Sequence, residues 1–582
     1  MFILPVILLL TRAANAFQPC SIFGPGFTAP HNLSVSPAFK EASDNFTSLI
    51  ESVISSSKSR YGQFDSNTTT FSLQVFSTST DPPLYEFHHT APGLEYSGTG
   101  VREVNSDSIY RIGSVTKLLT VYSFLNTAGD ANFHDPVTRW VPELRAAASS
   151  NNSTEDPVEY VAWNDVTLGQ LAAQMAGIGR DGSLQGEITQ ETLNWTGYGF
   201  PPLESSSIPT CGAVKLCNRT EFFEIFSDRP PVYLPSTTPV YSNVAFQILA
   251  YALEEIVGQP FPDIFEQTMR KDLGLTRTAL SIPANDTFTA NGVIPLGLAN
   301  SGWAFDGGDE NPAGTAYSTA NELSSIGRSI LRSSLLPPAL TLRWMKPVGR
   351  TADPNLLAGA GFEILTFTDP STKQITDLYT KSGNLGIYSS LLILSPDYDF
   401  GFTIMSAGLN NLDTAQAIGQ LLVDHFVPAV VNAARAEADS NYAGTYSSPD
   451  PALNSSINLS TIPSQLGLSI TSWISNGTDM LAVSAELVLR SPGSPVTVTL
   501  YPTNLKSQAS DGSYQRQFRA TFEDPTVENP GGLFTNKCQS WVFMEEIVYG
   551  RLALDEFVFT VEKGGSARSL VSSALREVLS RQ

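Results

Sequence analysis

The spacing of apolar residues changes once along the 582-residue chain, near residue 440, and this change constrains the fold more than any other feature. From about Phe17 to Val430, helical and strand patterns are mixed. After about Tyr442, short runs of alternating apolar and polar residues are separated by Ser, Pro, Gly and Asn turns. Such alternation is typical of β-strands. We therefore expect two domains, joined within residues 432–440.

The second domain, residues 436–582, is predicted to be β-rich. Its clearest alternating runs are 466–471, 481–489 and 496–501, and we expect a helical tail near 567–579. The first domain, residues 17–435, is interrupted at about 181–239 by a long insertion rich in turn-forming residues. No internal repeat is visible.

The charge of the chain argues against a nucleic-acid partner. It has 34 Lys and Arg against 56 Asp and Glu, which gives a formal net charge of -22. Nucleic-acid phosphates must be neutralised by clustered cations, and anionic lipid attracts basic segments. We expect neither nucleic acid nor an anionic membrane surface as a partner.

The N-terminus resembles a secretory signal peptide over residues 1–16. An apolar run ends at Leu10, and Ala14-Asn15-Ala16 resembles a cleavage site before Phe17. The run is too short to span a bilayer, and no later segment is expected to form a stable membrane anchor. N-glycosylation sequons lie at Asn32, Asn45, Asn67, Asn151, Asn152, Asn194, Asn218, Asn285, Asn454, Asn458 and Asn476. These features predict a secreted protein with N-linked glycans.

The four cysteines, Cys20, Cys211, Cys217 and Cys538, form an even set that suits an oxidising compartment. Cys211 and Cys217 could close a small local loop, which would leave Cys20 to pair with Cys538, but three pairings stay open. The chain has no C-x-x-C and no pair of His residues at ligand spacing. We therefore expect no metal and no other cofactor.

Ser114 and Lys117 form the motif most suggestive of chemistry. They lie three residues apart at the start of a predicted helix, so that their side chains share one face. Ser114 heads a stripe with Leu118, Val121 and Leu125 that suggests burial. A serine hydroxyl is a poor nucleophile until a base takes its proton, and a buried lysine with a lowered pKa could do so. The same spacing recurs at Ser55–Lys58 without an apolar stripe, which we interpret as a solvated helix end.

Two further segments strengthen the functional interpretation of Ser114 and Lys117. Tyr241-Ser242-Asn243 opens a predicted helix that closes at Gly258, and a tyrosine near cations can move a proton. Lys381-Ser382-Gly383-Asn384 ends a short predicted strand, 375–380, ahead of a hairpin formed by 389–394 and 402–406. A Lys and a hydroxyl beside a glycine on a strand edge can bind a carboxylate or carbonyl. Each element also has a purely structural interpretation, as a helix cap or a surface strand end.

Taken in order, Ser114-x-x-Lys117, Tyr241-x-Asn243 and Lys381-Ser382-Gly383 resemble the serine β-lactamase and penicillin-binding-protein superfamily. The most similar branch contains class C β-lactamases, D-alanyl-D-alanine carboxypeptidases and family VIII esterases, and the secreted type resembles β-lactamase-related proteins of filamentous fungi. Three other segments agree with it: 167–178, 273–278 and Pro312–Leu323. The resemblance implies an α+β fold, with an antiparallel sheet flanked by helices and an all-helical subdomain.

The resemblance also implies roles for the residues. Ser114 would be the nucleophile, Lys117 its partner and Tyr241 a general base and acid. Asn243, Lys381, Ser382, Gly383 and Asn384 would line the substrate site, with the N–H groups of Ser114 and Asn384 as the oxyanion hole. The chain departs from the family at Ser382, where Thr is usual, at 174–177, in the 181–239 insertion and in its extra β-domain.

The function that follows is a secreted serine hydrolase that forms an acyl-enzyme on Ser114 and cleaves or transfers an ester, lactone, amide or thioester of a small molecule. A role in fungal natural-product metabolism is compatible with this. Two alternatives remain: an isomerase or cyclase that uses the Lys and Tyr cluster, and an inactive binding protein. The variant Ser114→Ala separates them, because only the hydrolase needs the hydroxyl. The pattern of residues indicates neither the substrate nor the oligomeric state.

Overall fold

The computed structural model describes residues 20–582 except 151–155, 191–193, 285 and 464. The predicted signal peptide, the sequons at Asn151, Asn152 and Asn285, and part of the insertion lie outside the described residues. The chain divides into two compact units. Of the described residues, unit 2 comprises those within 31–367 and 377–429, and unit 1 comprises those within 20–30, 368–376 and 430–582.

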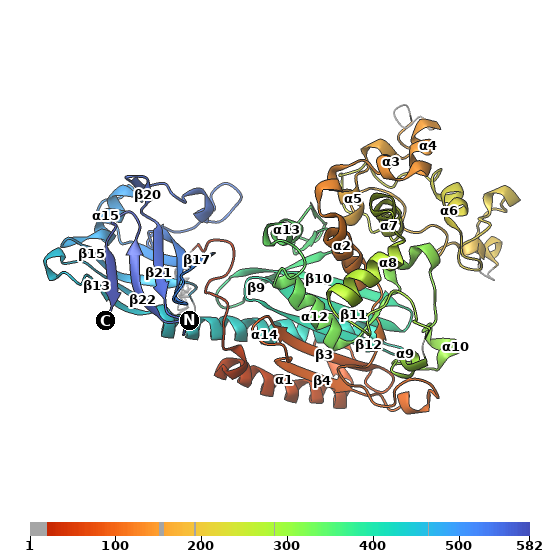
Figure 1. The fold of residues 1–582 in the computed structure, drawn as a ribbon, viewed down its shortest axis with the longest axis horizontal. Coiled ribbons are helices and arrows are strands. Elements are labelled where there is room, and N and C mark those ends of the chain that lie inside the picture. The colour runs from red at the N-terminus through yellow and green to blue at the C-terminus, as the bar shows by residue number, and fades with distance from the viewer. Residues whose placement is uncertain (1–19, 151–155, 191–193, 285, 464) are drawn as a thin grey trace, which may run out of the picture. The chain divides into compact units, whose positions relative to one another are not determined.

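Unit 2 is built on an antiparallel sheet of eight strands in the order β4-β3-β12-β11-β10-β9-β8-β7 (Figure 1). The strands are β3 (Thr70–Ser77), β4 (Tyr85–His89), β7 (Gly349–Arg350), β8 (Leu356–Ala358), β9 (Glu363–Thr368), β10 (Ile375–Leu385), β11 (Tyr388–Ser395) and β12 (Phe400–Ala407). The predicted hairpin is confirmed as β11 and β12. The strand that precedes it runs on through Lys381–Asn384 to Leu385 rather than ending before them.

Helices cover both faces of this sheet. Successive side chains of a strand point to opposite sides, and those of β11 and β12 are buried on both. On β11, Leu394 approaches Gly327 of α12 (Ala320–Leu331), whereas Leu391 approaches Gly419 of α14 (Asn411–Tyr442). On that second face Phe426 of α14 packs against aromatic residues of α1 (Pro37–Ser56), which runs beneath β3 and β4 in Figure 1. The predicted sheet flanked by helices is confirmed.

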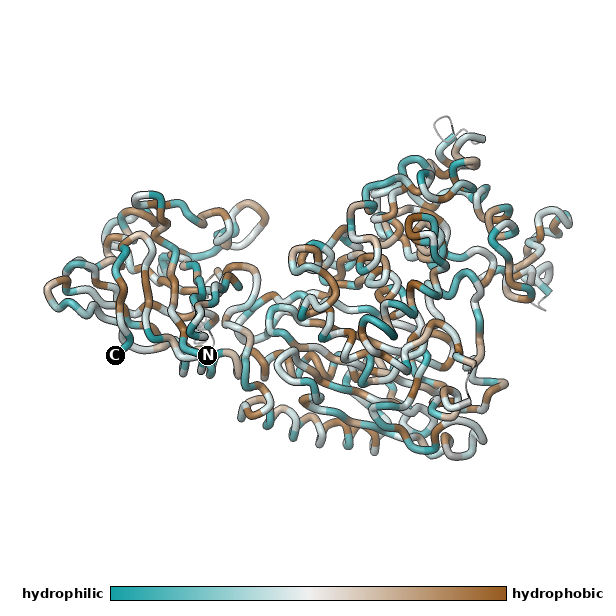
Figure 2. The backbone as a smooth tube through the Cα atoms, in the orientation of Figure 1, coloured by the Kyte–Doolittle hydropathy of each residue, from teal (hydrophilic) through white to brown (hydrophobic). Residues whose placement is uncertain are grey.

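The rest of unit 2 is a largely helical subdomain whose core is continuous with that of the sheet. Helices α2 (Val115–Ala128) and α7 (Val244–Val257) pack side by side within it. Figure 2 shows α7 as mostly apolar, and ten of its residues are buried. The other α-helices of the unit are α3 (Val137–Trp140), α4 (Pro142–Ser150), α5 (Leu168–Ala172), α6 (Arg219–Phe226), α8 (Phe261–Glu266), α9 (Asp286–Ala290), α10 (Leu298–Ser301), α11 (Asn311–Gly314) and α13 (Pro338–Trp344).

Unit 1 is β-rich, as predicted. The strands of its main sheet are β13 (Gly444–Ser447), β14 (Ser456–Ser460), β15 (Leu468–Ser475), β16 (Thr478–Asp479), β17 (Thr497–Gln508), β18 (Tyr514–Glu523), β21 (Glu556–Val561), β22 (Ala567–Ser572) and β23 (Val578–Arg581). They form an antiparallel sheet in the order β14-β13-β23-β22-β21-β18-β17-β15-β16, and pairing of β14 with β15 closes it on itself. Trp473, Phe518, Phe557 and Phe559 are buried in it.

Two predicted elements of unit 1 were wrong. Residues 567–579 form β22 and β23 instead of a helical tail, because pairing with β21 completes the closed sheet and outweighs local propensity. Conversely, the run predicted as a strand at 481–489 is mostly the helix α15 (Met480–Leu487). The side chain of Asp479 accepts hydrogen bonds from the N–H groups of Leu481 and Ala482 and so caps that helix.

The region predicted to join the domains is a continuous helix. Residues 432–440 lie within α14, which is long and apolar enough to cross a membrane by length and composition alone. The sequence did not predict so long and apolar a segment here, and the absence of a stable membrane anchor stays a prediction. Of the most apolar 18-residue window of this helix, 72% is buried inside the protein, as in a core helix.

The four cysteines form two disulfides, Cys211–Cys217 and Cys20–Cys538, with Cα atoms 5.0 and 5.1 Å apart. This resolves the pairing that the sequence left open. Among the sequons that the structure describes, the asparagine is exposed at Asn32, Asn45, Asn67, Asn194, Asn218, Asn454 and Asn476, and partly buried at Asn458.

Candidate active site

The predicted site residues converge where α2, α7 and β10 meet. Ser114 is the N-cap residue of α2, is partly exposed, and precedes helical residues that are all buried as far as Leu125. Lys117, one turn on, is fully buried, and its Nζ donates to Ser114 Oγ at 3.1 Å. By contrast, Ser55 and Lys58 are exposed, and α1 ends before Lys58. The two Ser-x-x-Lys copies thus differ as predicted.

Lys117 is held by neutral acceptors. Besides Ser114, its Nζ donates to Asn243 Oδ1 and to the carbonyl oxygen of Ala313, each at 2.6 Å. Burial lowers the pKa of Lys117, and the charge of Lys381 acts in the same direction, while Tyr241 opposes both. An ammonium in this position releases its proton more readily than one in water.

Tyr241 lies between two lysines. Its ring centroid is 4.9 Å from Lys117 Nζ and 5.4 Å from Lys381 Nζ, and its side chain is hydrogen-bonded to Ser114 and Lys117. Burial alone would raise the pKa of the phenol, but the charges of Lys381 and Lys117 outweigh burial and lower it. Its phenolate is therefore more populated than in an isolated tyrosine.

Lys381 differs from Lys117 in having a carboxylate partner. Its Nζ donates to Glu363 Oε1 at 2.5 Å and to the carbonyl oxygen of Ser382 at 2.7 Å. Glu363 also accepts from the Ser382 hydroxyl at 2.7 Å and from the Ser382 N–H at 2.9 Å. Burial would lower the pKa of Lys381, but Glu363 and Tyr241 together raise it. Lys381 is thus a fixed cation.

The backbone of β10 passes very close to the loop before Ser114. A Cβ on Gly383 would lie 2.0 Å from the carbonyl oxygen of Ile112, and one on Gly113 would lie 2.6 Å from Asn384 N. Gly113 also has a φ of +50°, which favours glycine. Only residues without a Cβ allow β10 and the loop before Ser114 to approach each other this closely.

The register of the hairpin directs the N–H of Asn384 away from β11. The two-residue loop after Leu385 makes Leu385 and Tyr388 a hydrogen-bonded pair, so that Asn384 and Ser389 form a non-hydrogen-bonded pair. Ser382, two residues earlier, turns its N–H away from β11 in the same way and donates it to Glu363. The Asn384 side chain instead donates to Ser389 and Asn411. Asn384 therefore presents its backbone, and not its side chain, to the loop before Ser114.

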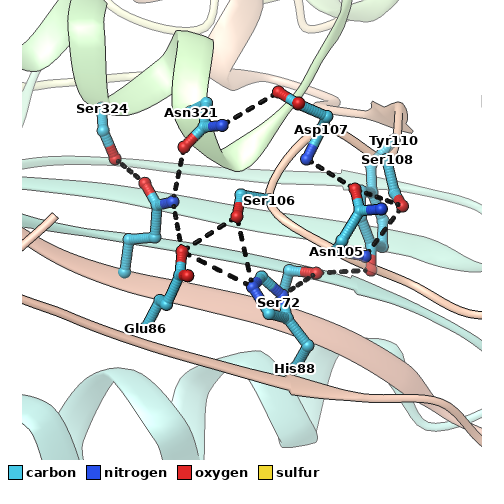
Figure 3. A network of polar contacts seen from close by, with 11 residues as sticks. Ser72, Glu86, His88, Asn105, Ser106, Asp107, Ser108, Tyr110, Asn321 and Ser324 are labelled. Carbon is cyan, nitrogen blue, oxygen red and sulfur yellow. Dashed lines mark hydrogen bonds and ion pairs between the residues drawn. The ribbon is translucent and has the colours of Figure 1, made fainter. Parts of the chain in front are cut away.

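Apart from this site, a Ser-His-carboxylate group lies on β3 and β4 (Figure 3). His88 Nδ1 is 2.9 Å from Ser72 Oγ, and His88 Nε2 is 3.7 Å from Glu86 Oε2. Ser72 is fully buried, however, and its Oγ is 3.0 Å from the hydroxyl of Tyr110 in the strand before Ser114. A nucleophile must reach solvent or substrate, so this cluster supports β5 (Tyr110–Arg111) and is not a second reaction centre.

Comparison with profiles of known families identifies the family of the chain. A profile of the family described as "Beta-lactamase" matches residues 60–425, more than half of the chain. The chain belongs to the β-lactamase family. A second profile, "Beta-lactamase-like-like, C-terminal domain", matches residues 434–582 of this family member.

Relatives of this β-lactamase family member are known from fungi. A "Beta-lactamase-like protein" of Arthroderma benhamiae is 28% identical over 96% of this chain and 95% of its own length. A "Probable hydrolase" of Phoma sp. is 27% identical over 78% of this chain and 74% of its own. A solved structure of a class C β-lactamase is 14% identical, with a TM-score of 0.47, over 66% of this chain and 96% of its own.

Sequence reasoning missed the residues that support the site. Glu363 anchors Lys381 and Ser382, and Gln174 clamps Ser242 by accepting from its N–H at 2.7 Å and donating to its carbonyl at 3.2 Å. Asp181 accepts from Asn243 Nδ2 at 2.7 Å. A lone acidic residue at the start of an apolar strand was the one signal for Glu363. Nothing local marks Gln174 or Asp181, since their partners lie more than 60 residues away.

The 181–239 insertion is attached beside the site at both ends. Its first residue, Asp181, is buried and hydrogen-bonded to Asn243, and its last part runs alongside residues 174–177. There the N–H groups of Val232 and Ser236 donate to the carbonyls of Gly177 and Met175. Between these ends, the disulfide Cys211–Cys217 closes a short loop ahead of α6.

Proposed function

We propose that this β-lactamase-like protein is a serine hydrolase that forms an acyl-enzyme on Ser114. The observation that carries the proposal is the contact of Lys117 Nζ with Ser114 Oγ at 3.1 Å, in a site where burial and the charge of a second lysine lower the pKa of Lys117. Relatives named as probable hydrolases support the same class of reaction.

In the proposed reaction, Ser114 Oγ attacks the carbonyl carbon of an ester, lactone, amide or thioester. The proton of Ser114 passes to Lys117 or Tyr241 as the C–O bond forms, and the same groups return a proton to the leaving atom. The N–H groups of Ser114 and Asn384 stabilise the oxyanion, and Asn243 and Lys381 orient the substrate. Water or another acceptor then takes the acyl group from Ser114.

A fluorophosphonate tests the proposal directly. We expect intact-mass measurement to show one adduct, peptide mapping to place it on Ser114, and Ser114→Ala to abolish it. Ser55→Ala, in the exposed copy of the motif, is the matched control and should label like the wild type. An adduct elsewhere, or turnover that survives Ser114→Ala, would contradict the proposal, and survival with Tyr241→Phe inactive would favour an isomerase or cyclase.

We also propose that the protein acts in an oxidising, secretory environment. The two disulfides and the exposed asparagines of most described sequons support this location. Expression in a eukaryotic secretory host should give an N-terminus at Phe17 and a mass that falls on treatment with an N-glycosidase. An intracellular, unglycosylated product would contradict it.

A further inference from the structure

Asn243, which orients the substrate in the proposed reaction, also joins Lys117 to residues behind the site that the reaction does not use. Asn243 accepts from Lys117 through Oδ1, and its Nδ2 donates to Asp181 Oδ1 at 2.7 Å. An amide can turn over and exchange its oxygen for its NH₂ group, which has no lone pair to offer an ammonium. The acceptor on Asp181 therefore decides that the oxygen of Asn243, and not its NH₂, faces Lys117.

Asp181 is itself one half of a buried carboxyl pair. Its side chain is hydrogen-bonded to Glu310, and the two residues are 6% and 8% exposed. A hydrogen bond between two carboxyl groups requires one proton, because two carboxylates offer only acceptors. Burial raises the pKa of Glu310 to about 8, and the charge of Asp181 raises it as well. Glu310 is therefore the protonated partner at neutral pH.

The charges around this pair are few. Lys117 and Arg180 oppose the rise in the pKa of Glu310, and Arg180 Nε lies 3.3 Å from Asp181 Oδ2. The Arg180 guanidinium also lies over the Tyr241 ring, 4.9 Å from its centroid. The adjacent carboxylate of Asp309 instead accepts from the hydroxyl of Tyr251 at 2.7 Å. Asp309 is thus a nearby carboxylate that takes no part in the pair.

We propose that Asp181 and Glu310 share one proton and act, through the amide of Asn243, as the positioning pair that holds Lys117 against Ser114. The inference rests on the proposed function of Ser114 and adds a control on it. While Glu310 keeps its proton, the pair carries a single negative charge and Asn243 stays oriented. When Glu310 loses the proton, a second negative charge appears near Lys117 and stabilises its ammonium form, which cannot accept the proton of Ser114.

The test is the rate constant for fluorophosphonate labelling of Ser114, measured from below to above the midpoint of Glu310 near pH 8. Asp181→Ala removes the acceptor for Asn243 and should slow labelling about ten-fold or more. Glu310→Gln keeps a neutral donor but cannot ionise. It should match the wild type below the midpoint and lack the loss of rate that the wild type shows above it. Asp309→Asn is the matched control and should follow the wild type throughout.

The outcomes separate this proposal from the one before it. No labelling of Ser114 in the wild-type protein would remove the proposed function itself. With the wild type labelled, the pair is refuted if Asp181→Ala labels as fast as Asp309→Asn, or if Glu310→Gln and wild type have parallel pH profiles. Should Asp181→Ala not fold, Asp181→Asn keeps the volume and one acceptor oxygen. The loss of rate should then begin at a lower pH than in the wild type, because the charge of Asp181 raises the pKa of Glu310, and a profile that coincides with the wild type would also refute the pair.

Discussion

Two lysines, both buried and both beside Tyr241, face each other across the site with opposite properties. Lys117 donates to a hydroxyl, an amide oxygen and a backbone carbonyl, all of them neutral. Lys381 donates to the carboxylate of Glu363. The pKa of Lys117 is lowered and that of Lys381 is raised. The difference teaches that burial alone does not set the role of a lysine, because one carboxylate partner reverses its effect.

The largest expected effect comes from making the same substitution at both lysines. Lys117→Arg keeps a cation but removes the group that can lose a proton, since arginine stays protonated. We expect labelling of Ser114 to slow by about 10²–10⁴-fold, the range for loss of general acid–base catalysis. Lys381→Arg keeps the fixed charge and should cost much less. Equal losses at the two positions would mean that the lysines do not differ in role.

Tyr241→Phe removes the group that both lysines share, and we expect the next largest effect. The phenol hydrogen-bonds to Ser114, and without it Lys117 is the one proton acceptor left beside the nucleophile. Labelling should slow by about 10²-fold, at the lower end of the same range. The pKa of each lysine should fall, because Tyr241 raises both. The pH dependence of labelling measures this, and an unchanged rate would remove Tyr241 from the mechanism.

Glu363→Gln removes the carboxylate partner of Lys381 and leaves it, like Lys117, with neutral acceptors. Without its counter-ion, Lys381 should lose its proton at a lower pH, and the alkaline limb of the labelling profile should shift to a lower pH.

The pKa of Glu363 is lowered in the folded protein, because Lys381 and Ser382 together outweigh the opposing effect of burial. Its contribution to stability is therefore present above its ordinary pKa of about 4.3 and is lost as the pH falls through the folded value.

Denaturant unfolding measures that contribution. We expect Glu363→Gln to lower the free energy of unfolding by about 1.5–3 kcal/mol at neutral pH, the range for a hydrogen bond to a charged group. The difference from the wild type should shrink in acid. A difference that is the same at every pH would show that the charge of Glu363 is not what holds Lys381.

The smallest effect is expected at Ser382. Ser382→Ala removes one of three donors to Glu363 and leaves the Lys381 contact and the backbone N–H in place. Labelling should fall by no more than about ten-fold, which corresponds to the lower end of the range for a hydrogen bond to a charged group. Ser382→Thr keeps the hydroxyl and is the matched control. A loss as large as that of Tyr241→Phe would give Ser382 a direct part in the chemistry.

The sequence by itself determined the elements that local pattern controls. The apolar stripe that follows Ser114 predicted a buried helix, and Gly258 predicted where the helix after Asn243 ends. The alternation after residue 440 predicted a β-rich region. The order of three short motifs was enough to identify the family. Each stripe, turn and motif depends on residues within a few positions of one another, and the order of the motifs follows the chain, so a single sequence displays these features directly.

The tertiary structure decided what depends on residues distant in the chain. The segments 567–572 and 578–581 are strands because they pair with other strands of the closed sheet. The helix at 480–487 is instead a local feature, capped by the adjacent Asp479, and the alternating pattern predicted it wrongly. Glu363, Asp181 and Glu310 meet the motif residues only after folding. Electrostatic energies depend on distance in space and on burial, so the opposite pKa shifts of Lys117 and Lys381 follow from those neighbours and not from the motifs.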